Sequence, residues 1–170
     1  MEEPLLESFE HRLEDLGATS ERVEPSELTD AVVEEATQPA IASRSLAKDA
    51  WLSDTWVTVD PTPADIWDAK TGISHASFGI APYGSIYLEY DREGSEFVSL
   101  FVNKHIAVLD GRNIFPDMDA AFDHISEAVP THRGSGIIAT GPSATADMGE
   151  LVRGAHGPAD VHVIIVKEGR

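Results

Sequence analysis

A run of apolar residues near the end of the chain, VHVIIV at 161–166, restricts the fold most strongly. Such continuous runs are typical of strands covered on both faces, which occur in parallel or mixed sheets with helices on either side. The run GIIAT at 136–140 predicts a second buried strand. Between them we expect a short helix from about Thr145 to Val152, ended by Gly154. Strand, helix and strand would then form a βαβ unit with two parallel strands.

The middle of the chain alternates apolar runs with brief turns. Three runs predict strands, SIYLEY at 85–90, EFVSLFV at 96–102 and HIAVLD at 105–110. Strands joined by such short turns pair in an antiparallel or mixed manner. The β-branched run TWVTV at 55–59 predicts a further strand. These patterns together predict an α/β fold, with a mixed β-sheet flanked by helices.

Apolar residues at helical spacing predict helices around these strands. The predicted helices cover 4–16, 26–36, 62–70 and 116–129. Ser26 is the N-cap candidate of the second helix, and Thr62 with Asp65 forms a capping-box-like start for the third. The stretch 38–53 carries mixed signals and is expected to be irregular or weakly helical.

The length of 170 residues is enough for one domain core and too short for two ordinary domains. We therefore expect a single domain over 1–170. Within it, 1–53 form a mostly helical acidic N-terminal segment and 54–170 form the α/β core.

The chain is strongly acidic, with 30 Asp and Glu against 12 Lys and Arg and a formal net charge of −18. This charge repels the phosphates of nucleic acids and anionic lipids, so we expect neither as a partner. Only four of the twelve basic residues are lysine. Molar salt would screen the self-repulsion of such a surface, which favours a halophilic origin over an acidic protein of an ordinary cytosol.

Composition and spacing also exclude several kinds of site. The chain has no cysteine, which rules out disulfides, thiolate nucleophiles and a cysteine-ligated iron–sulfur cluster within it. Its seven histidines show neither HxH nor HExxH spacing, so we expect no metal and no bound cofactor. No apolar run approaches the ~20 residues of a membrane span, and the N-terminus is acidic where a signal peptide is basic. We therefore expect a cytoplasmic protein.

The stretch GPSATADMGELVRGAHGP, 141–158, admits two interpretations. It follows a predicted strand and begins a predicted helix, and ligands of α/β sheets gather beyond the carboxyl ends of parallel strands. A small carboxylate or phosphate could then bind at the helix N-terminus, with help from the hydroxyls of Ser143 and Thr145. Alternatively, these hydroxyls only cap the helix and Asp147 lies favourably in its first turn. His156 follows the helix and is either a proton donor or a partner of its last carbonyls.

Two further segments carry candidate residues. The stretch 71–90 contains Thr71, Gly72, Gly84 and Ser85, which form a small polar approach to a strand and suit backbone contact with a ligand. They are equally compatible with an ordinary loop and turn. His162, within the last strand, is interpreted as a hydrogen-bonded strand residue.

Taken together, these segments resemble the LUD-domain family, in particular its lactate utilization protein C group. The most specific part is Gly141-Pro-Ser-x-Thr-Ala-Asp147, followed by Gly154-x-His-Gly-Pro158 and the terminal strand from His162. Ser99-Leu100, His105-Ile106-Ala107-Val108 and the Gly84-Ser85 turn add independent support. The likeness is strongest over 70–166.

This resemblance implies a fold like that of the sugar-phosphate isomerase and CoA-transferase group. It also implies a role in oxidising L-lactate to pyruvate alongside separate iron–sulfur oxidoreductase subunits. Three positions depart from the family's pattern: Pro82 replaces a glutamate, Glu96 an arginine and Val102 a proline. Losing a carboxylate and reversing a charge would alter acid/base chemistry or anion binding if these positions face a pocket.

The sequence thus predicts a small anionic ligand bound near 141–147. The candidate ligand-binding residues are Thr71, Gly72, Gly84, Ser85, Gly141, Ser143, Thr145 and Gly157. Candidates for orienting the ligand or moving protons are His105, Asp147 and His156. Two alternatives remain: a non-catalytic interaction or accessory subunit, and an isomerase- or transferase-like enzyme for a phosphorylated or CoA-linked substrate. A homo-oligomer is compatible with each.

Overall fold

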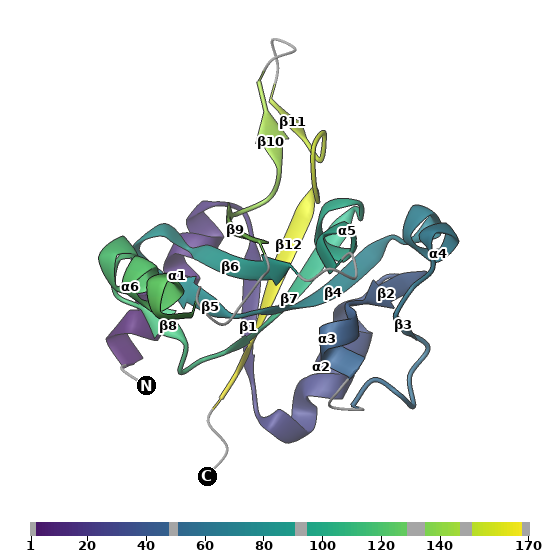
Figure 1. Cartoon of the computed structure of the whole chain (residues 1–170), viewed down its shortest axis with the longest axis horizontal. Coiled ribbons are helices and arrows are strands. Elements are labelled where there is room, and N and C mark those ends of the chain that lie inside the picture. The colour runs from purple at the N-terminus through teal and green to yellow at the C-terminus, as the bar shows by residue number, and fades with distance from the viewer. Residues whose placement is uncertain (1–2, 48–50, 91–94, 129–134, 147–150, 168–170) are drawn as a thin grey trace.

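Two β-sheets and a projecting hairpin make up the computed structural model, which describes residues 3–47, 51–90, 95–128, 135–146 and 151–167 (Figure 1). The larger sheet has six strands, all parallel. Their spatial order is β1 (Thr19–Val23), β12 (Asp160–Val166), β7 (Lys104–Asp110), β4 (Thr71–Ala76), β2 (Ala40–Ala42) and β3 (Thr58–Val59). The smaller sheet has the order β8 (Ile114–Phe115), β5 (Phe78–Ile80), β6 (Ser85–Tyr90) and β9 (Ser135–Thr140).

The apolar runs at 161–166 and 105–110 form neighbouring central strands, as the sequence predicts. β12 pairs with β7 over its whole length, with Val163 opposite Ala107. Five successive residues are buried in each of the two strands. Burial on both faces explains why neither run alternates with polar residues.

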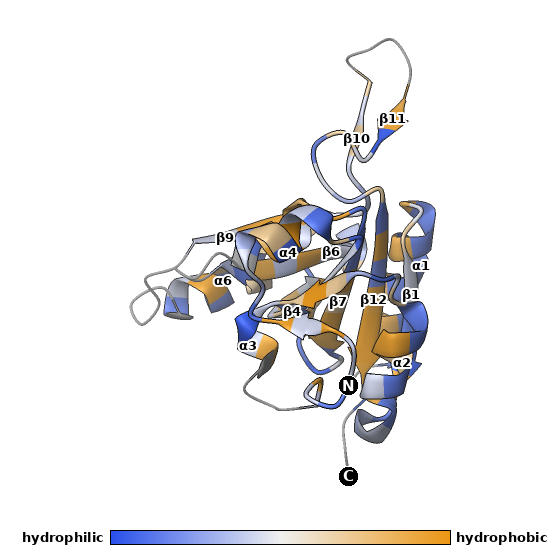
Figure 2. Ribbon diagram, turned by 90° about the vertical axis from the view of Figure 1, so that its right-hand side faces the viewer, coloured by the Kyte–Doolittle hydropathy of each residue, from blue (hydrophilic) through white to orange (hydrophobic). Residues whose placement is uncertain are grey.

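One face of the larger sheet is covered by the smaller sheet and by α1 (Glu3–Asp15). Leu6, Phe9 and Leu13 of α1 share a core with Ile86 and with residues of β7 and β12. The spacing of these α1 residues is that of one helical stripe, and the helix predicted over 4–16 is confirmed. Figure 2 shows hydrophobic residues on the side of α1 that faces the strands and hydrophilic residues outside.

The opposite face is covered by α2 (Leu28–Glu35), which follows the exposed 3-10 turn η1 (Pro25–Glu27), and by α3 (Arg44–Ala47). Val32 of α2 packs with Ile106 and Ile164 of the sheet. The predicted second helix is therefore present, but Ser26 is not its cap. Glu24 and Glu27 form the capping box at the start of η1 instead.

Two short helices are α4 (Pro63–Asp68), whose Ile66 packs near Ile41 of β2, and α5 (Ser95–Leu100), which lies over the inner strands β4 and β7. The capping box of Thr62 and Asp65 forms as the sequence predicts. The strand predicted over 96–102 is wrong, because 95–100 are helical and place Val98 and Val102 together on Ile41. With this helix in between, β6 and β7 belong to different sheets rather than to one antiparallel series.

The βαβ unit predicted over 136–166 is also wrong. β9 is a strand, but it pairs antiparallel with β6 in the smaller sheet and is largely exposed. The predicted helix 145–152 is replaced by a hairpin, in which β10 (Ala144–Thr145) pairs antiparallel with β11 (Val152–Arg153). The helix prediction over 147–150 lies outside the described residues. Figures 1 and 2 both show this hairpin projecting from the body of the protein.

The remaining elements agree with the sequence in part. The helix predicted over 116–129 is observed as α6 (Met118–Ala128), with Val129 outside the described residues. The strand predicted over 55–59 is shortened to β3. The strands β1, β2 and β4 were not predicted, and the first two place part of the 1–53 segment within the larger sheet. The expectation of an α/β fold with a mixed sheet arrangement and an N-terminal helix is confirmed.

Candidate functional site

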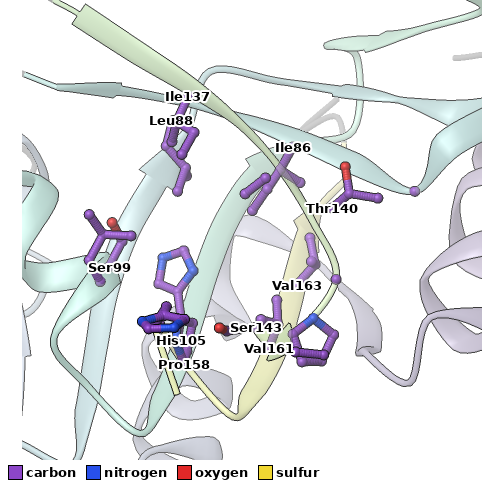
Figure 3. Close-up of a pocket in the computed structure, with 18 of the residues that line it drawn as sticks. Ile86, Leu88, Ser99, His105, Ile137, Thr140, Ser143, Pro158, Val161 and Val163 are labelled. Atoms are coloured by element: carbon purple, nitrogen blue, oxygen red, sulfur yellow. The ribbon is translucent and has the colours of Figure 1, made fainter. Parts of the chain in front are cut away.

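A cavity of about 330 Å³ lies between the two sheets, next to the base of the projecting hairpin. Aliphatic side chains line most of it. The smaller sheet contributes Ile86, Leu88 and Ile137, and the larger sheet contributes Val161 and Val163 (Figure 3). The other lining residues are Leu13, Gly84, Tyr90, Ser99, Leu100, His105, Ala139, Thr140, Gly141, Pro142, Ser143, Ala144, His156, Gly157 and Pro158.

The cavity lies at the amino ends of two central parallel strands. His105 and Val161 are each the second residue of their strand and are paired in register. The sequence predicted a site beyond the carboxyl end of a parallel strand, and this prediction is wrong. Gly141 does follow the end of β9, but β9 belongs to the antiparallel part of the other sheet.

His105 is a buried polar group of the cavity wall, with 2% of its surface exposed, the same fraction as Ser99. Its Nε2 atom lies 2.8 Å from the Oγ atom of Ser74, on the neighbouring strand β4. Burial lowers the pKa of His105 to about 4, so the imidazole is neutral at pH 7. A neutral imidazole can donate one hydrogen bond and accept another, which suits it to orient a ligand hydroxyl.

A second polar group of the wall joins Tyr90 of β6 to Ser99 of α5. The Tyr90 hydroxyl lies 3.3 Å from the Ser99 Oγ, which donates a hydrogen bond to the carbonyl oxygen of Glu96. Burial raises the pKa of Tyr90, so its phenol stays protonated at neutral pH. Neither residue was predicted as a ligand contact. The only sequence signal was that Ser99-Leu100 is part of the family resemblance.

Glu96, one of the positions that depart from the family's pattern, lies close behind this pair. Its Oε2 atom is buried and has no hydrogen-bond partner. A buried carboxylate oxygen without a hydrogen-bond partner is costly to the fold. Glu96 does not line the cavity itself.

The turn at Gly141–Ser143 closes one end of the cavity and is held by backbone hydrogen bonds. The Ser143 N–H donates to the Pro158 carbonyl, and the Gly154 N–H donates to the Ser143 carbonyl, both at 2.9 Å. These two amides are therefore occupied. The turn offers a ligand the Ser143 side chain rather than the free N–H groups of a helix N-terminus. Asp147 lies outside the described residues.

The cavity collects six of the residues that the sequence singled out. They are Gly84, His105, Gly141, Ser143, His156 and Gly157. His156 is exposed at the rim, whereas His105 lies at the bottom of the wall.

The other predicted ligand-binding residues lie outside the cavity lining. Thr71 is buried and exchanges hydrogen bonds with the backbone of Thr37. A Cβ atom at Gly72 would fall on the carbonyl oxygen of Val98, so the absence of a side chain there lets α5 pack on the sheet. Ser85 shares a hydrogen bond of 2.7 Å with Thr140. Thr145 is part of β10.

The interpretation of His162 is supported. Its Nδ1 atom lies 2.7 Å from the Thr19 hydroxyl, and its Nε2 atom lies 3.3 Å from a Glu21 carboxylate oxygen. It is 5% exposed and lies on the face of the sheet that also carries Ile164, away from Val161 and Val163.

The lining of the cavity contains no lysine, arginine, aspartate or glutamate among the residues described. Within the same part of the chain, no group of three or more His, Asp or Glu is arranged to hold a metal ion. None of the helices described is both long and apolar enough to cross a membrane.

Comparison with known proteins assigns a family. Residues 6–166 match the LUD domain, which confirms the resemblance indicated by the sequence motifs. The chain is 31% identical to the Lactate utilization protein C of Oceanobacillus iheyensis over 103 residues, covering 58% of this chain and 44% of that protein. It is 30% identical to the Lactate utilization protein C of Bacillus subtilis over 138 residues, covering 69% and 55%. The chain thus spans about half the length of the curated relatives it matches.

A solved structure has the same fold. It is that of a DUF162 family protein from Deinococcus radiodurans, with a TM-score of 0.75 over 96% of both chains and 21% sequence identity. The arrangement of the two sheets is therefore shared by proteins of clearly divergent sequence.

Proposed function

The chain belongs to the LUD-domain family, and on that premise we propose that it acts in lactate utilization by binding a small hydroxy or keto carboxylate between its two sheets. The observation that carries the proposal is the cavity, in which three segments of the resemblance converge, 84–90, 99–105 and 141–158. Its volume of about 330 Å³ lies at the lower end of the range for small-molecule sites.

We propose that the ligand's polar end meets hydroxyl groups. Ser143 lies in the lining as a donor, and so does the protonated Tyr90 hydroxyl, whereas the Ser99 hydroxyl already donates to the Glu96 carbonyl. Since the described residues of the lining include no lysine or arginine, the negative charge of a carboxylate would be stabilised by these donors and by the ring N–H of His156. The methyl group of a lactate-sized ligand would pack on Val161 and Val163.

Proton movements would divide between the two histidines. His105 is neutral and held by Ser74, which suits it to position the ligand hydroxyl. His156 is exposed at the rim and can exchange protons with solvent. We include Asp147 in the proposed site on the basis of the family motif.

Oxidation of a hydroxy acid to a keto acid removes two electrons and two protons from the carbinol group. The chain has no cysteine to hold an iron–sulfur cluster, so these electrons would pass to separate iron–sulfur oxidoreductase subunits. We propose these subunits as partners of a single LUD domain that works in the cytoplasm.

A thermal-shift series in molar salt tests ligand binding directly. Lactate and pyruvate should raise the melting temperature in a concentration-dependent manner, since a ligand that binds only the folded state stabilises it. Sugar phosphates and coenzyme A are the comparison ligands. Ser143→Ala should weaken the shift, whereas Ser126→Ala on α6, an exposed hydroxyl outside the cavity, should leave it unchanged. No shift with any carboxylate would contradict the proposal.

One observation favours a second candidate, a non-catalytic accessory subunit. Among its described residues the lining has no carboxylate to act as a general base, and Glu96 places a buried, unpartnered oxygen behind the wall instead. Such a subunit would bind the carboxylate or its partner proteins without turnover. The third alternative, a phosphorylated or CoA-linked substrate, is less well supported because the part of the lining that the structure describes offers no lysine or arginine to a phosphate.

A further inference from the structure

The larger and the smaller sheet each have two outer strands, and these differ in how well they are protected from pairing with a strand of another chain. β3 and β8 are two residues long, and β1 carries the charged residues Glu21 and Arg22. Short length and charge both prevent a sheet edge from pairing with another chain. β9 has six residues, SGIIAT, with neither a charged residue nor a proline. It is the outer strand that lacks these protections.

β9 is also accessible. It pairs with β6 over all six residues on one side, and within the described part of the chain no strand pairs with its other side. Four of its six residues are exposed, Ser135, Gly136, Ile137 and Thr140, of which Ile137 and Thr140 lie on the cavity lining. The chain then turns at Gly141 into the hairpin, which projects away from the body of the protein (Figure 1).

We propose that β9 is the surface through which two copies of this chain pair, antiparallel, to join their smaller sheets into one. An antiparallel pair of identical strands is self-complementary about a twofold axis, as a symmetric dimer requires. Because the strand is uncharged, no like charges face each other along the contact, although each chain carries a formal charge of −18. A basic strand of another protein would find no acidic side chain on β9 to pair with.

The pairing has a consequence for the cavity. Ile137 and Ala139 of β9 form part of its wall. In the dimer this wall becomes an internal strand with partners on both sides. The inference is independent of the proposed function, since it requires only that β9 is an unprotected edge.

Sedimentation analysis of the intact chain at low and at molar salt tests the pairing. A monomer–dimer equilibrium is expected, shifted toward the dimer by salt because salt screens the repulsion between the two acidic chains. A chain that is monomeric at every salt and protein concentration would overturn the proposal, and the edge would then be free for a strand of another protein.

Two variants locate the contact. Ser135→Lys puts a charge on β9 outside the cavity lining, and Ile137→Lys puts one at its centre. Each should weaken the dimer by about tenfold or more, since the charge enters twice in a symmetric pair. Phe122→Lys, on the exposed surface of α6, is the matched control and should leave the dimer intact. A dimer that survives both β9 substitutions, or one that Phe122→Lys weakens equally, would overturn the assignment to β9.

Melting curves show whether each variant is folded. Because Ser135 lies outside the cavity lining, Ser135→Lys tests the dimer contact without changing the ligand site. If this variant loses the dimer but lactate or pyruvate still raises its melting temperature, the pairing through β9 is supported separately from the ligand site. If no variant and no form of the protein shows a rise with these ligands, the proposed function is contradicted and the pairing is not.

Discussion

The imidazole of His105 and the hydroxyl of Ser74 lie 2.8 Å apart on adjacent parallel strands, beneath the cavity. The contact fixes the imidazole ring of a histidine that has almost no access to solvent. A histidine in this position is a pH-sensitive part of the fold, whatever its role in ligand binding.

Lowering the pH from 7 to 5 should destabilise the protein through His105. Its pKa in the folded state is about 4, below the ordinary value of 6.5, so between these values the unfolded chain binds more protons than the folded one. Its contribution is fully present above pH 6.5 and declines as the pH falls toward 4. Between pH 7 and pH 5 the free energy of unfolding should fall by about 2 kcal/mol from this residue alone. Urea unfolding at both pH values measures the change.

The control compares two substitutions at both pH values. His105→Gln should remove this part of the pH dependence, and His124→Gln on the exposed side of α6 should retain it. An unchanged pH dependence in His105→Gln would assign the effect to the carboxylates instead.

Gly72→Ala should strongly destabilise the protein. A Cβ atom at this position would occupy the place of the Val98 carbonyl oxygen in α5, so the helix would have to move off the sheet. We expect a loss of about 3 kcal/mol or more, typical of overpacking at a backbone contact. Gly157→Ala is the comparison, because its Cβ would meet only the Ser143 side chain, at 3.2 Å. Thermal unfolding of both variants checks the order, and an equal loss would contradict the contact between Gly72 and α5.

Ala139→Leu should fill part of the cavity without introducing a polar group. The added methyl groups would lie among Ile86, Leu88 and Val161, so the melting temperature should stay within a few degrees of the unsubstituted chain. The shift caused by lactate or pyruvate should disappear. Ala120→Leu on α6 lies outside the lining and should preserve the shift. A ligand shift that persists in Ala139→Leu would place the ligand elsewhere.

Molar potassium chloride should raise the free energy of unfolding of the chain. The net charge of −18 repels itself in the compact state, and salt screens this repulsion. Urea unfolding at low and at molar salt gives the difference. Equal stability in the two conditions would contradict the halophilic interpretation.

The strands at 161–166 and 105–110 were predictable because their continuous apolar runs have one stable location, the interior of a sheet. β1 was not predictable in the same way, since TSERV carries polar residues and becomes a strand by pairing with β12. The segment 96–102 fits both a strand and a helix by its apolar spacing. Packing of Val98 and Val102 on Ile41 decides for the helix, and that contact is not visible in a local window.

The candidate site was partly predictable, and mainly from the family resemblance. The motifs at 84–85, 99–108 and 141–158 are far apart in sequence, and nothing local indicates that they meet at one cavity. The hydroxyls of Ser143 and Thr145 suggested a capped helix, but the same residues suit a turn and a hairpin strand equally well. Tyr90 and Ser99 were missed because their role depends on the approach of α5 to β6.

The first helix does more than cover a sheet. Leu13 lines the cavity, Leu16 lies against Gly141, and the Arg153 guanidinium of the hairpin packs over Gly17. Shortening the protein from its N-terminus to Ala18 would therefore remove a wall of the ligand cavity and the support of the turn that closes it. A failure of such a shortened protein to bind carboxylates would reflect this loss and would carry no information about the chemistry of residues 141–158.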